Sequence, residues 1–177
     1  MNAEIAIMLA AEGDAFLLAL QMSRSEREYK NYLQLQKEGK TTFLVAWEGK
    51  TPVGHLLIRW DGSLEIPRIV DRIPLAAKFA GYPSFESVEV RPDRRGRGIG
   101  TSLIRHAEEL AHKRGFEKAV IEVDIDNPRA RALYERLGYT ESGLGEFTTS
   151  GTYIDDDDGN MVKWTNGPQV QLIKKLG

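Results

Sequence analysis

The sequence has no cysteine and only three histidines among its 177 residues. The absence of cysteine excludes disulfides, thiolate nucleophiles and Cys-based zinc or iron–sulfur sites. His106 and His112 fall on one predicted helix at a spacing that points them to different sides of it. No HExxH signature occurs, and no serine has the two flanking glycines of a GxSxG turn. We therefore expect no metal site and no serine hydrolase.

A long apolar run and an excess of one charge are also missing. The 24 Lys and Arg residues nearly balance 26 Asp and Glu residues, for a net charge of −2. Such a chain is not built to bind a polyanion such as nucleic acid. No segment approaches the ~20 apolar residues that span a membrane, and the start, MNAEIAIMLAAEGDAF, lacks the basic region of a secretory signal. We expect one cytoplasmic domain covering residues 1–177, with neither nucleic acid nor membrane as a partner.

The first half of the chain contains signals for both helices and strands. Ser25 and Glu28 form a capping-box pattern that opens a helix. In chain order the patterns predict a short strand over residues 3–9, a helix over 12–22 and the capped helix over 25–39. A β-hairpin over 42–60 and a long proline-containing loop over 61–84 follow. A helix start fits residues 3–9 nearly as well as a strand.

The second half alternates strands and helices more regularly. The patterns predict a strand over residues 85–91, a helix over 98–114, a strand over 118–126 and a helix over 127–137. Two closing strands follow over 139–147 and 169–176. We interpret Asp155–Asp158 as a solvated turn between the closing strands. The helix 98–114 should join strands 85–91 and 118–126 as parallel neighbours. The whole order predicts an α/β fold with a mixed sheet.

A glycine-rich loop lies between the strand 85–91 and the helix that follows it. Gly96, Gly98 and Gly100 let the backbone approach a ligand without interference from a Cβ atom. The first amides of the helix point outward, and the helix dipole favours an anion there. Four arginines within residues 91–97 are offset by Asp93 alone, which leaves a local charge of about +3. These features favour a phosphate or pyrophosphate site.

Several known phosphate loops can be compared with this one. An ATP-type loop needs Lys-Ser/Thr after its last glycine, where this chain has Thr101-Ser102. A dinucleotide loop needs GxGxxG directly after the strand, whereas the glycines here are spaced GxGxG after a linker. The pattern that fits is Arg-x-x-Gly-x-Gly over residues 95–100. A solvated glycine-rich connection remains the alternative at this point.

A second motif follows one strand later, with the sequence NPRARALYERLGY over residues 127–139. With this motif the chain resembles the GCN5-related N-acetyltransferase (GNAT) superfamily, whose pattern is N-x-x-A-x-x-L-Y-E-x-x-G-F. Tyr139 stands where the family usually has Phe. The resemblance covers residues 40–145 well and the two ends poorly. It implies a GNAT-like acyl-CoA N-acyltransferase fold, in which a central mixed, splayed sheet is flanked by helices and residues 85–139 hold the core motifs.

The resemblance also implies an activity and a cofactor site. The family transfers an acetyl group from acetyl-CoA directly to an amine in a ternary complex. Carried over by motif, the backbone of Val88, Glu89 and Val90 would hold the pantetheine arm, and Asn127 would bond it beside the sulfur. Tyr134 would act as the general acid that protonates the departing thiolate. The pyrophosphate would lie on the amides of Gly96, Arg97, Gly98, Ile99, Gly100 and Thr101, with Arg95 and Arg97 as nearby cations.

The acceptor amine must lose a proton before it can react. A lysine-like amine with a pKa of ~10.4 is neutral in only about one of 2,500 molecules at pH 7. Glu122 is the first candidate base, Glu89 the second, and Glu86 lies on the same strand as Glu89. A water relay is a further alternative.

No motif identifies the acceptor. The variable segments 10–40 and 61–84 should determine it, and a peptide N-terminus, a lysine, a polyamine or an aminoglycoside would all fit. Two competing functions are a non-catalytic acetyl-CoA-sensing module on the same fold and nucleotide binding by the basic loop. A homodimer is compatible with the sequence.

Overall fold

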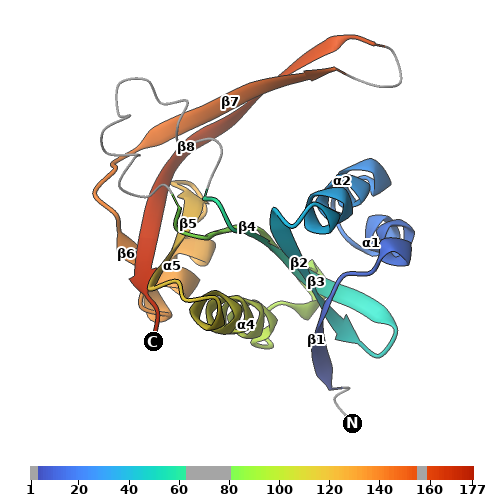
Figure 1. Ribbon diagram of the computed structural model, residues 1–177, viewed down its shortest axis with the longest axis horizontal. Helices are drawn as coiled ribbons and strands as arrows, with labels where there is room; N and C mark the ends of the chain where they lie inside the picture. The colour runs from blue at the N-terminus through green and yellow to red at the C-terminus, as the bar shows by residue number, and fades with distance from the viewer. Residues whose placement is uncertain (1–3, 63–80, 155–158) are drawn as a thin grey trace.

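The computed structural model describes residues 4–62, 81–154 and 159–177 (Figure 1). A mixed sheet has the strand order β1-β2-β3-β4-β5-β8-β6, and β7 pairs with β8 beside this path. Neighbouring strands are antiparallel except β4 and β5. The strands are β1 Ile5–Leu9, β2 Thr41–Glu48, β3 Thr51–Arg59, β4 Ser84–Val90, β5 Lys118–Asp124, β6 Thr140–Glu141, β7 Phe147–Ile154 and β8 Met161–Lys175.

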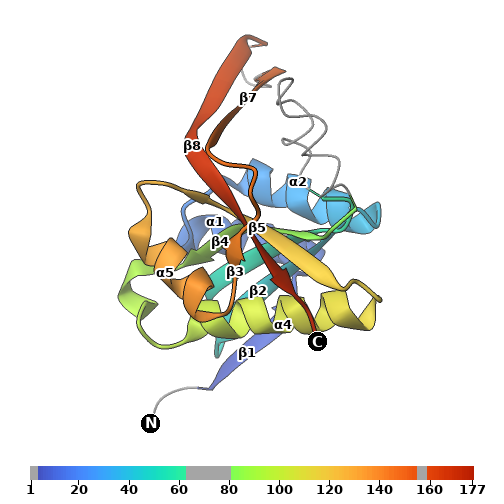
Figure 2. The ribbon, with the colours of Figure 1, turned by 90° about the vertical axis from the view of Figure 1, so that its left-hand side faces the viewer.

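Helices cover both faces of the sheet (Figure 2). Helices α1 (Ala15–Gln21) and α2 (Glu26–Lys37) lie on one face, while α4 (Ile99–Lys113) and α5 (Pro128–Arg136) belong to the core on the other. The predicted capping box is confirmed, because the Ser25 side chain accepts from the Glu28 amide and the Glu28 carboxylate accepts from the Ser25 amide. The helix predicted over 12–22 is a short 3-10 turn, Glu12–Asp14, followed by α1.

The central strands are buried on both sides because a helical layer lies on each face. Along β2, Phe43 and Val45 pack under α1 and α2, whereas Leu44 and Ala46 pack under α4. This explains the nearly continuous apolar run of β2, since a strand covered on both faces has no solvent-facing positions. The predicted hairpin over 42–60 is confirmed, with small changes at its ends.

The predicted parallel neighbours β4 and β5 are also confirmed, but their pairing is short. Only two residue pairs join them, Ser84 with Val120 and Phe85 with Ile121. Beyond this point a β-bulge displaces β4: Ser87 and Val88 together face Leu56 between the paired positions of β3. Ser87 has a φ of +50°, which is strained for a residue with a side chain. The two strands therefore separate, and a cleft opens between them.

The closing strands differ from the prediction. Residues 139–147 do not form one strand: β6 covers only Thr140–Glu141, and Gly143 and Gly145, both with positive φ, interrupt the chain before β7 begins. β8 begins at Met161, well before the predicted residue 169, and pairs with β7 in an arm that projects beyond the helical layers (Figure 1). Such a ribbon has no core to alternate against, so its sequence carries no clear period. The predicted turn at 155–158 and most of the loop 61–84 lie outside the described residues.

Candidate active site

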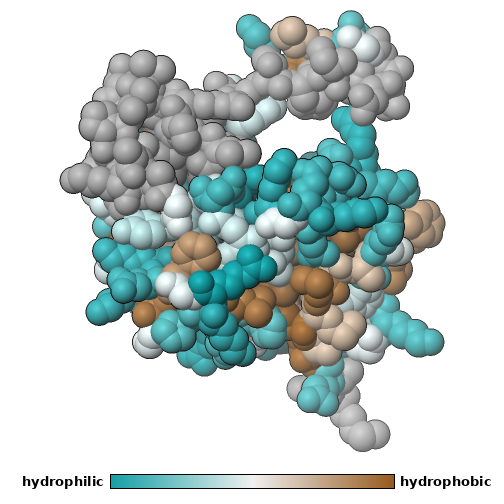
Figure 3. All heavy atoms as spheres, in the orientation of Figure 1, coloured by the Kyte–Doolittle hydropathy of each residue, from teal (hydrophilic) through white to brown (hydrophobic). Residues whose placement is uncertain are grey.

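The cleft between β4 and β5 has a volume of about 990 Å³. Its floor includes Leu57 and Phe85, α2 forms one wall, and β5, β8 and α5 form the other. Figure 3 shows hydrophilic side chains gathered along α2, below the projecting β7–β8 arm. Among the predicted site residues the cleft brings together Val88, Glu122, Asn127 and Tyr134. The two strands that the family resemblance assigns to cofactor and base thus line one space.

Asn127 and Tyr134 enter the cleft from α5. Asn127 is the N-cap of the helix, and its side-chain oxygen accepts a hydrogen bond from the Ala130 amide at 3.1 Å. Its side-chain amide group can therefore still donate to a ligand. Tyr134 is 5% exposed, and burial, with Asp124 adding to the effect, raises the pKa of its hydroxyl to about 12. The phenol is therefore protonated at neutral pH and able to donate a proton.

The glycine-rich loop leads from β4 into α4 and leaves a run of amides unused. Within the described residues, none of the backbone N–H groups from Gly96 to Thr101 donates a hydrogen bond to another protein group. Gly98 is the N-cap of α4 with a φ of +80°, a conformation that glycine adopts without strain. Six adjacent free amides at the positive end of a 15-residue helix make a strong anion site.

The first turn of α4 also packs closely on α5. A Cβ atom on Gly100 would lie 3.2 Å from the Leu133 side chain, which directly precedes Tyr134 in the chain. Glycine at this position lets the two helices approach. The anion site and the Tyr134 hydroxyl are therefore held by a shared helix contact.

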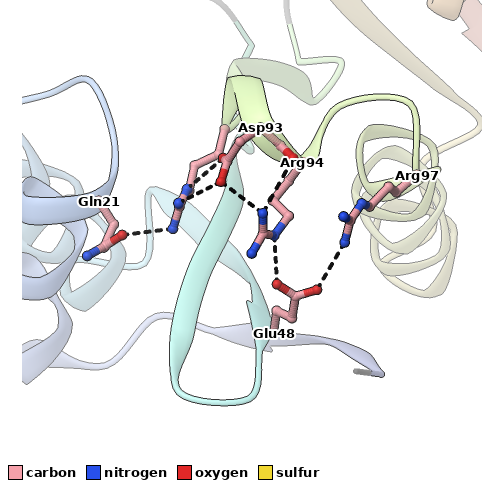
Figure 4. Close-up of polar contacts among 6 residues, drawn as sticks. Gln21, Glu48, Asp93, Arg94 and Arg97 are labelled. Carbon is pink, nitrogen blue, oxygen red and sulfur yellow. Dashed lines mark hydrogen bonds and ion pairs between the residues drawn. The ribbon is translucent and has the colours of Figure 1, made fainter. Parts of the chain in front are cut away.

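The arginines of the loop are largely paired with acids (Figure 4). Arg91 and Arg94 both contact Asp93, at 2.9 and 2.8 Å. Glu48, at the end of β2, accepts from Arg94 at 2.7 Å and lies 3.3 Å from Arg97. The local charge predicted from Asp93 alone is too high, because Glu48 lies there as well. The pairing leaves the amides, rather than a cloud of free cations, as the main anion-binding feature.

Two candidate bases occupy the cleft in different surroundings. Glu122 accepts from the Ser84 hydroxyl and from the Gln171 side-chain amide, both at 3.2 Å. Glu86 instead forms an ion pair with Arg59 at 3.3 Å. Glu122 is thus positioned by hydrogen bonds from neutral side chains of β4 and β8.

Glu89 does not line this cleft. It faces a smaller pocket of about 480 Å³, together with Ser23 and Arg95. Burial by itself would raise the pKa of Glu89, but hydrogen bonds from His55 and Ser23 outweigh it and lower the pKa to about 2. A carboxylate with so low a pKa is a weak base.

Sequence reasoning did not find several residues of the site. Arg24, which lies just before α2, and Trp164 of β8 both line the cleft. Trp164 is separated from Tyr134 by thirty positions and a misplaced strand boundary, so no local pattern brings them together. Trp47 and Trp60 are instead buried in the core.

The fold and this geometry can be compared with known proteins. The model of the Acetyltransferase (GNAT) family matches residues 9–139. The chain belongs to this family. The GNAT fold predicted from the sequence is also found in solved structures: the PaiA N-acetyltransferase of Thermoplasma acidophilum, in complex with coenzyme A, has a TM-score of 0.64 with 14% identity and covers 97% of this chain and 99% of its own.

Two curated relatives share a higher sequence identity with this chain over their aligned parts. An uncharacterized N-acetyltransferase of Methanocaldococcus jannaschii is 32% identical over 109 residues, which are 60% of this chain and 42% of that protein. Streptothricin acetyltransferase of Streptomyces lavendulae is 39% identical over 69 residues, 39% of this chain and 36% of that protein. The chain spans less than half the length of either relative.

Two further features are absent from the part of the chain that the structure describes. It contains no group of three His, Cys, Asp or Glu side chains that could hold a metal ion. None of its helices is long and apolar enough to cross a bilayer.

Proposed function

We propose that this chain is an N-acetyltransferase that transfers an acetyl group from acetyl-CoA to a primary amine in a ternary complex. The observation that carries this proposal is the placement of the free amides of Gly96 to Thr101 beside α5, whose Tyr134 lines the cleft between the separated strands. Free amides at a helix N-terminus bind a pyrophosphate well, and the phenol of Tyr134 is the kind of proton donor that a departing thiolate needs.

The residues of the loop and of β4 would hold acetyl-CoA, which supplies the activated acetyl group. The amides of residues 96–101 would bind the pyrophosphate, with Arg95 and Arg97 beside it. The freed edge of β4 at Val88 to Val90 would bind the pantetheine arm as a neighbouring strand does, and Asn127 would donate its side-chain amide to that arm.

Proton transfer can be assigned to two side chains across the cleft. Glu122 would take a proton from the amine, either directly or through a water, because it lines the cleft and hydrogen bonds from Ser84 and Gln171 hold its carboxylate there. Tyr134 would then donate its phenolic proton to the sulfur of the leaving thiolate. In water a phenol is a weaker acid than a thiol by ~1.5 pKa units. Burial raises the pKa of the Tyr134 hydroxyl further, to about 12, so the transfer is uphill and requires hydrogen-bond distance to the sulfur.

The walls of the cleft favour a polar acceptor. The α2 wall carries Arg24 and Glu28, and the opposite wall carries Glu122 and Asp124. An apolar acceptor would remove water from these charged groups without offering them hydrogen bonds, which is costly. Candidates are a peptide N-terminus, a lysine, a polyamine or an aminoglycoside.

The test has two stages. Acetyl-CoA should raise the melting temperature, and the rise should grow with the logarithm of its concentration above the Kd, because it binds only the folded chain. Release of free thiol should then be measured with spermidine, lysine, an alanine-initiated peptide and kanamycin. No thermal shift at millimolar acetyl-CoA would overturn the proposal, and a shift without turnover on any amine would favour an acetyl-CoA-sensing module.

A further inference from the structure

Glu89 makes a two-point contact with a residue far away in the sequence. Its Oε1 accepts from the Ser23 backbone amide at 3.0 Å, and its Oε2 accepts from the Ser23 hydroxyl at 2.6 Å. Ser23 lies in the turn between α1 and α2. Hydrogen bonds to an ionised carboxylate are shorter and stronger than neutral ones, so this pair fixes the turn against β4.

A buried polar pair supports Glu89 from behind. His55 of β3 is completely buried, and its Nε2 lies 3.3 Å from Glu89 Oε2 and 3.2 Å from the Tyr29 hydroxyl of α2. Its Nδ1 is buried with no partner in the described part of the chain. The carboxylate therefore selects the tautomer with its proton on Nε2, since the other tautomer would bury an unsatisfied N–H and set two lone pairs against each other.

The rigid surroundings of His55 make this contact a fixed point. Its ring packs edge-on against Tyr29 and against Phe43, with centroid distances of 5.5 and 5.6 Å. An imidazole that is buried and packed against two core rings does not follow a moving carboxylate. The position of Glu89 is thus determined by the core and not by the turn that contains Ser23.

The contact joins the two halves of the proposed site. Glu89 lies between Val88 and Val90, on the strand proposed to receive the pantetheine arm. Ser23 directly precedes Arg24, which lines both the main cleft and the smaller pocket. Movement of the turn would displace the wall that receives the acceptor relative to the strand that receives acetyl-CoA.

We propose that Glu89 is a positioning residue, which ties the acceptor-side turn at Ser23 to the cofactor-side strand with buried His55 and Tyr29 as its fixed support. This inference rests on the proposed acetyltransferase function. It assigns Glu89 a role different from that of a general base, and it makes Ser23 a determinant of acceptor binding without contact with the reacting atoms.

Three variants test the contact: Ser23→Ala, which removes only the exposed hydroxyl, Glu89→Gln, which keeps the shape but removes the charge, and the double variant. Steady-state kinetics use the amine of the panel with the highest turnover, and calorimetry gives the Kd for acetyl-CoA. Glu109→Gln is the matched control, because this glutamate is exposed on α4.

A positioning role predicts a separation between KM and kcat. Both single variants should raise the KM for the amine by about tenfold, as expected for loss of a charge-assisted hydrogen bond, with kcat and the acetyl-CoA Kd within about threefold of the parent. The double variant should be no worse than Glu89→Gln, because both changes remove one contact. Glu109→Gln should match the parent.

Three results would overturn the proposal. A fall in kcat of about a hundredfold in Glu89→Gln at constant KM, with loss of the rise of rate with pH, would make Glu89 the base. Additive effects in the double variant would mean that the two residues act separately, and an unchanged KM in both single variants would remove any link to acceptor binding. If Glu89→Gln does not fold, the KM of Ser23→Ala alone decides.

Failure of the proposed function gives a different pattern. If no amine is turned over by the parent, the contact is read from stability instead. Ser23→Ala should then lower the melting temperature in the parent background and leave it unchanged in the Glu89→Gln background. An equal decrease in both backgrounds would overturn the contact itself.

Discussion

The Tyr32 hydroxyl lies 2.8 Å from Oγ of Ser87, so a side chain of α2 holds the bulge of β4. Ser87 is the one non-glycine residue with positive φ in residues 4–62, 81–154 and 159–177. A left-handed conformation of this kind costs of order 1–3 kcal/mol and persists only where the surroundings enforce it. The hydrogen bond from α2 is one such constraint.

The bulge can be tested by pairing Tyr32→Phe with Ser87→Gly. Tyr32→Phe should lower the free energy of unfolding by about 1 kcal/mol, or the melting temperature by about 2–4 °C. In the Ser87→Gly background, where no hydroxyl and little strain remain, Tyr32→Phe should cost almost nothing. Equal losses in the two backgrounds, measured by thermal melts, would show that the pair does not interact.

Tyr134→Phe tests the proposed acid, because it keeps the ring and deletes only the hydroxyl. We expect turnover to fall by about 10²-fold, with little change in acetyl-CoA affinity or melting temperature. The control is Tyr139→Phe, since the two rings are only 6.3 Å apart and the family usually has Phe at that place. Full turnover in Tyr134→Phe would assign protonation of the thiolate to water.

Asn127 combines a structural and a proposed binding role, and two substitutions separate them. Asn127→Asp retains an N-cap oxygen for the Ala130 amide but replaces the side-chain amide donor with a carboxylate. Its melting temperature should hold while acetyl-CoA binds about tenfold more weakly. Asn127→Ala should lose both affinity and about 1 kcal/mol of stability. Parent-like affinity of Asn127→Asp would leave Asn127 as a helix cap alone.

Gly98 and Gly115 offer a matched comparison at the two ends of α4. Both have positive φ, +80° and +87°, and neither has a neighbour within 4 Å of a built Cβ. Alanine at either position should therefore cost about 1–2 kcal/mol from backbone strain. Only at Gly98 should a glutamate also abolish the acetyl-CoA-induced thermal shift, by placing negative charge among the free amides. A persisting shift in Gly98→Glu would move the pyrophosphate elsewhere.

The lowered pKa of Glu89 gives a stability effect with a defined direction. A carboxyl whose pKa falls from 4.5 to about 2 on folding stabilises the native state above pH 4.5. This stabilisation decreases as the pH falls and is gone below about 2. The free energy of unfolding of Glu89→Gln, measured by denaturant melts, should therefore fall less between pH 4.5 and 2 than that of the parent. Parallel acid limbs would mean that the carboxylate is not held in the native state.

Local signals account for the part of the fold that the sequence predicted. The capping box at Ser25, the N-cap at Asn127 and glycines such as Gly115 mark helix ends through their own chemistry, so β4, α4, β5 and α5 could be placed from nearby residues. The motif at residues 127–139 then identified the family.

The features that were missed depend on contacts between distant residues. Ser23 and Glu89 are 66 positions apart, and nothing in either neighbourhood predicts their contact. The bulge at Ser87 contains neither glycine nor proline and exists because β3, α2 and β4 meet there. The β7–β8 arm was misplaced because Asn166, Gly167 and Pro168 have the composition of a turn but lie within β8.

The short seam between β4 and β5 has a mechanical consequence. Only two residue pairs join the half of the sheet formed by β1–β4 to the half that contains β5, β7 and β8. Within each half, these neighbouring strands are paired at five or more positions. If the sheet bends between β4 and β5, only these two pairs are strained, and the hydrogen bonds within each half stay intact. An extended ligand bound along the open edge of β4 would connect the two halves. Backbone amides of β4 and β5 should therefore exchange with solvent more slowly once the ligand is bound.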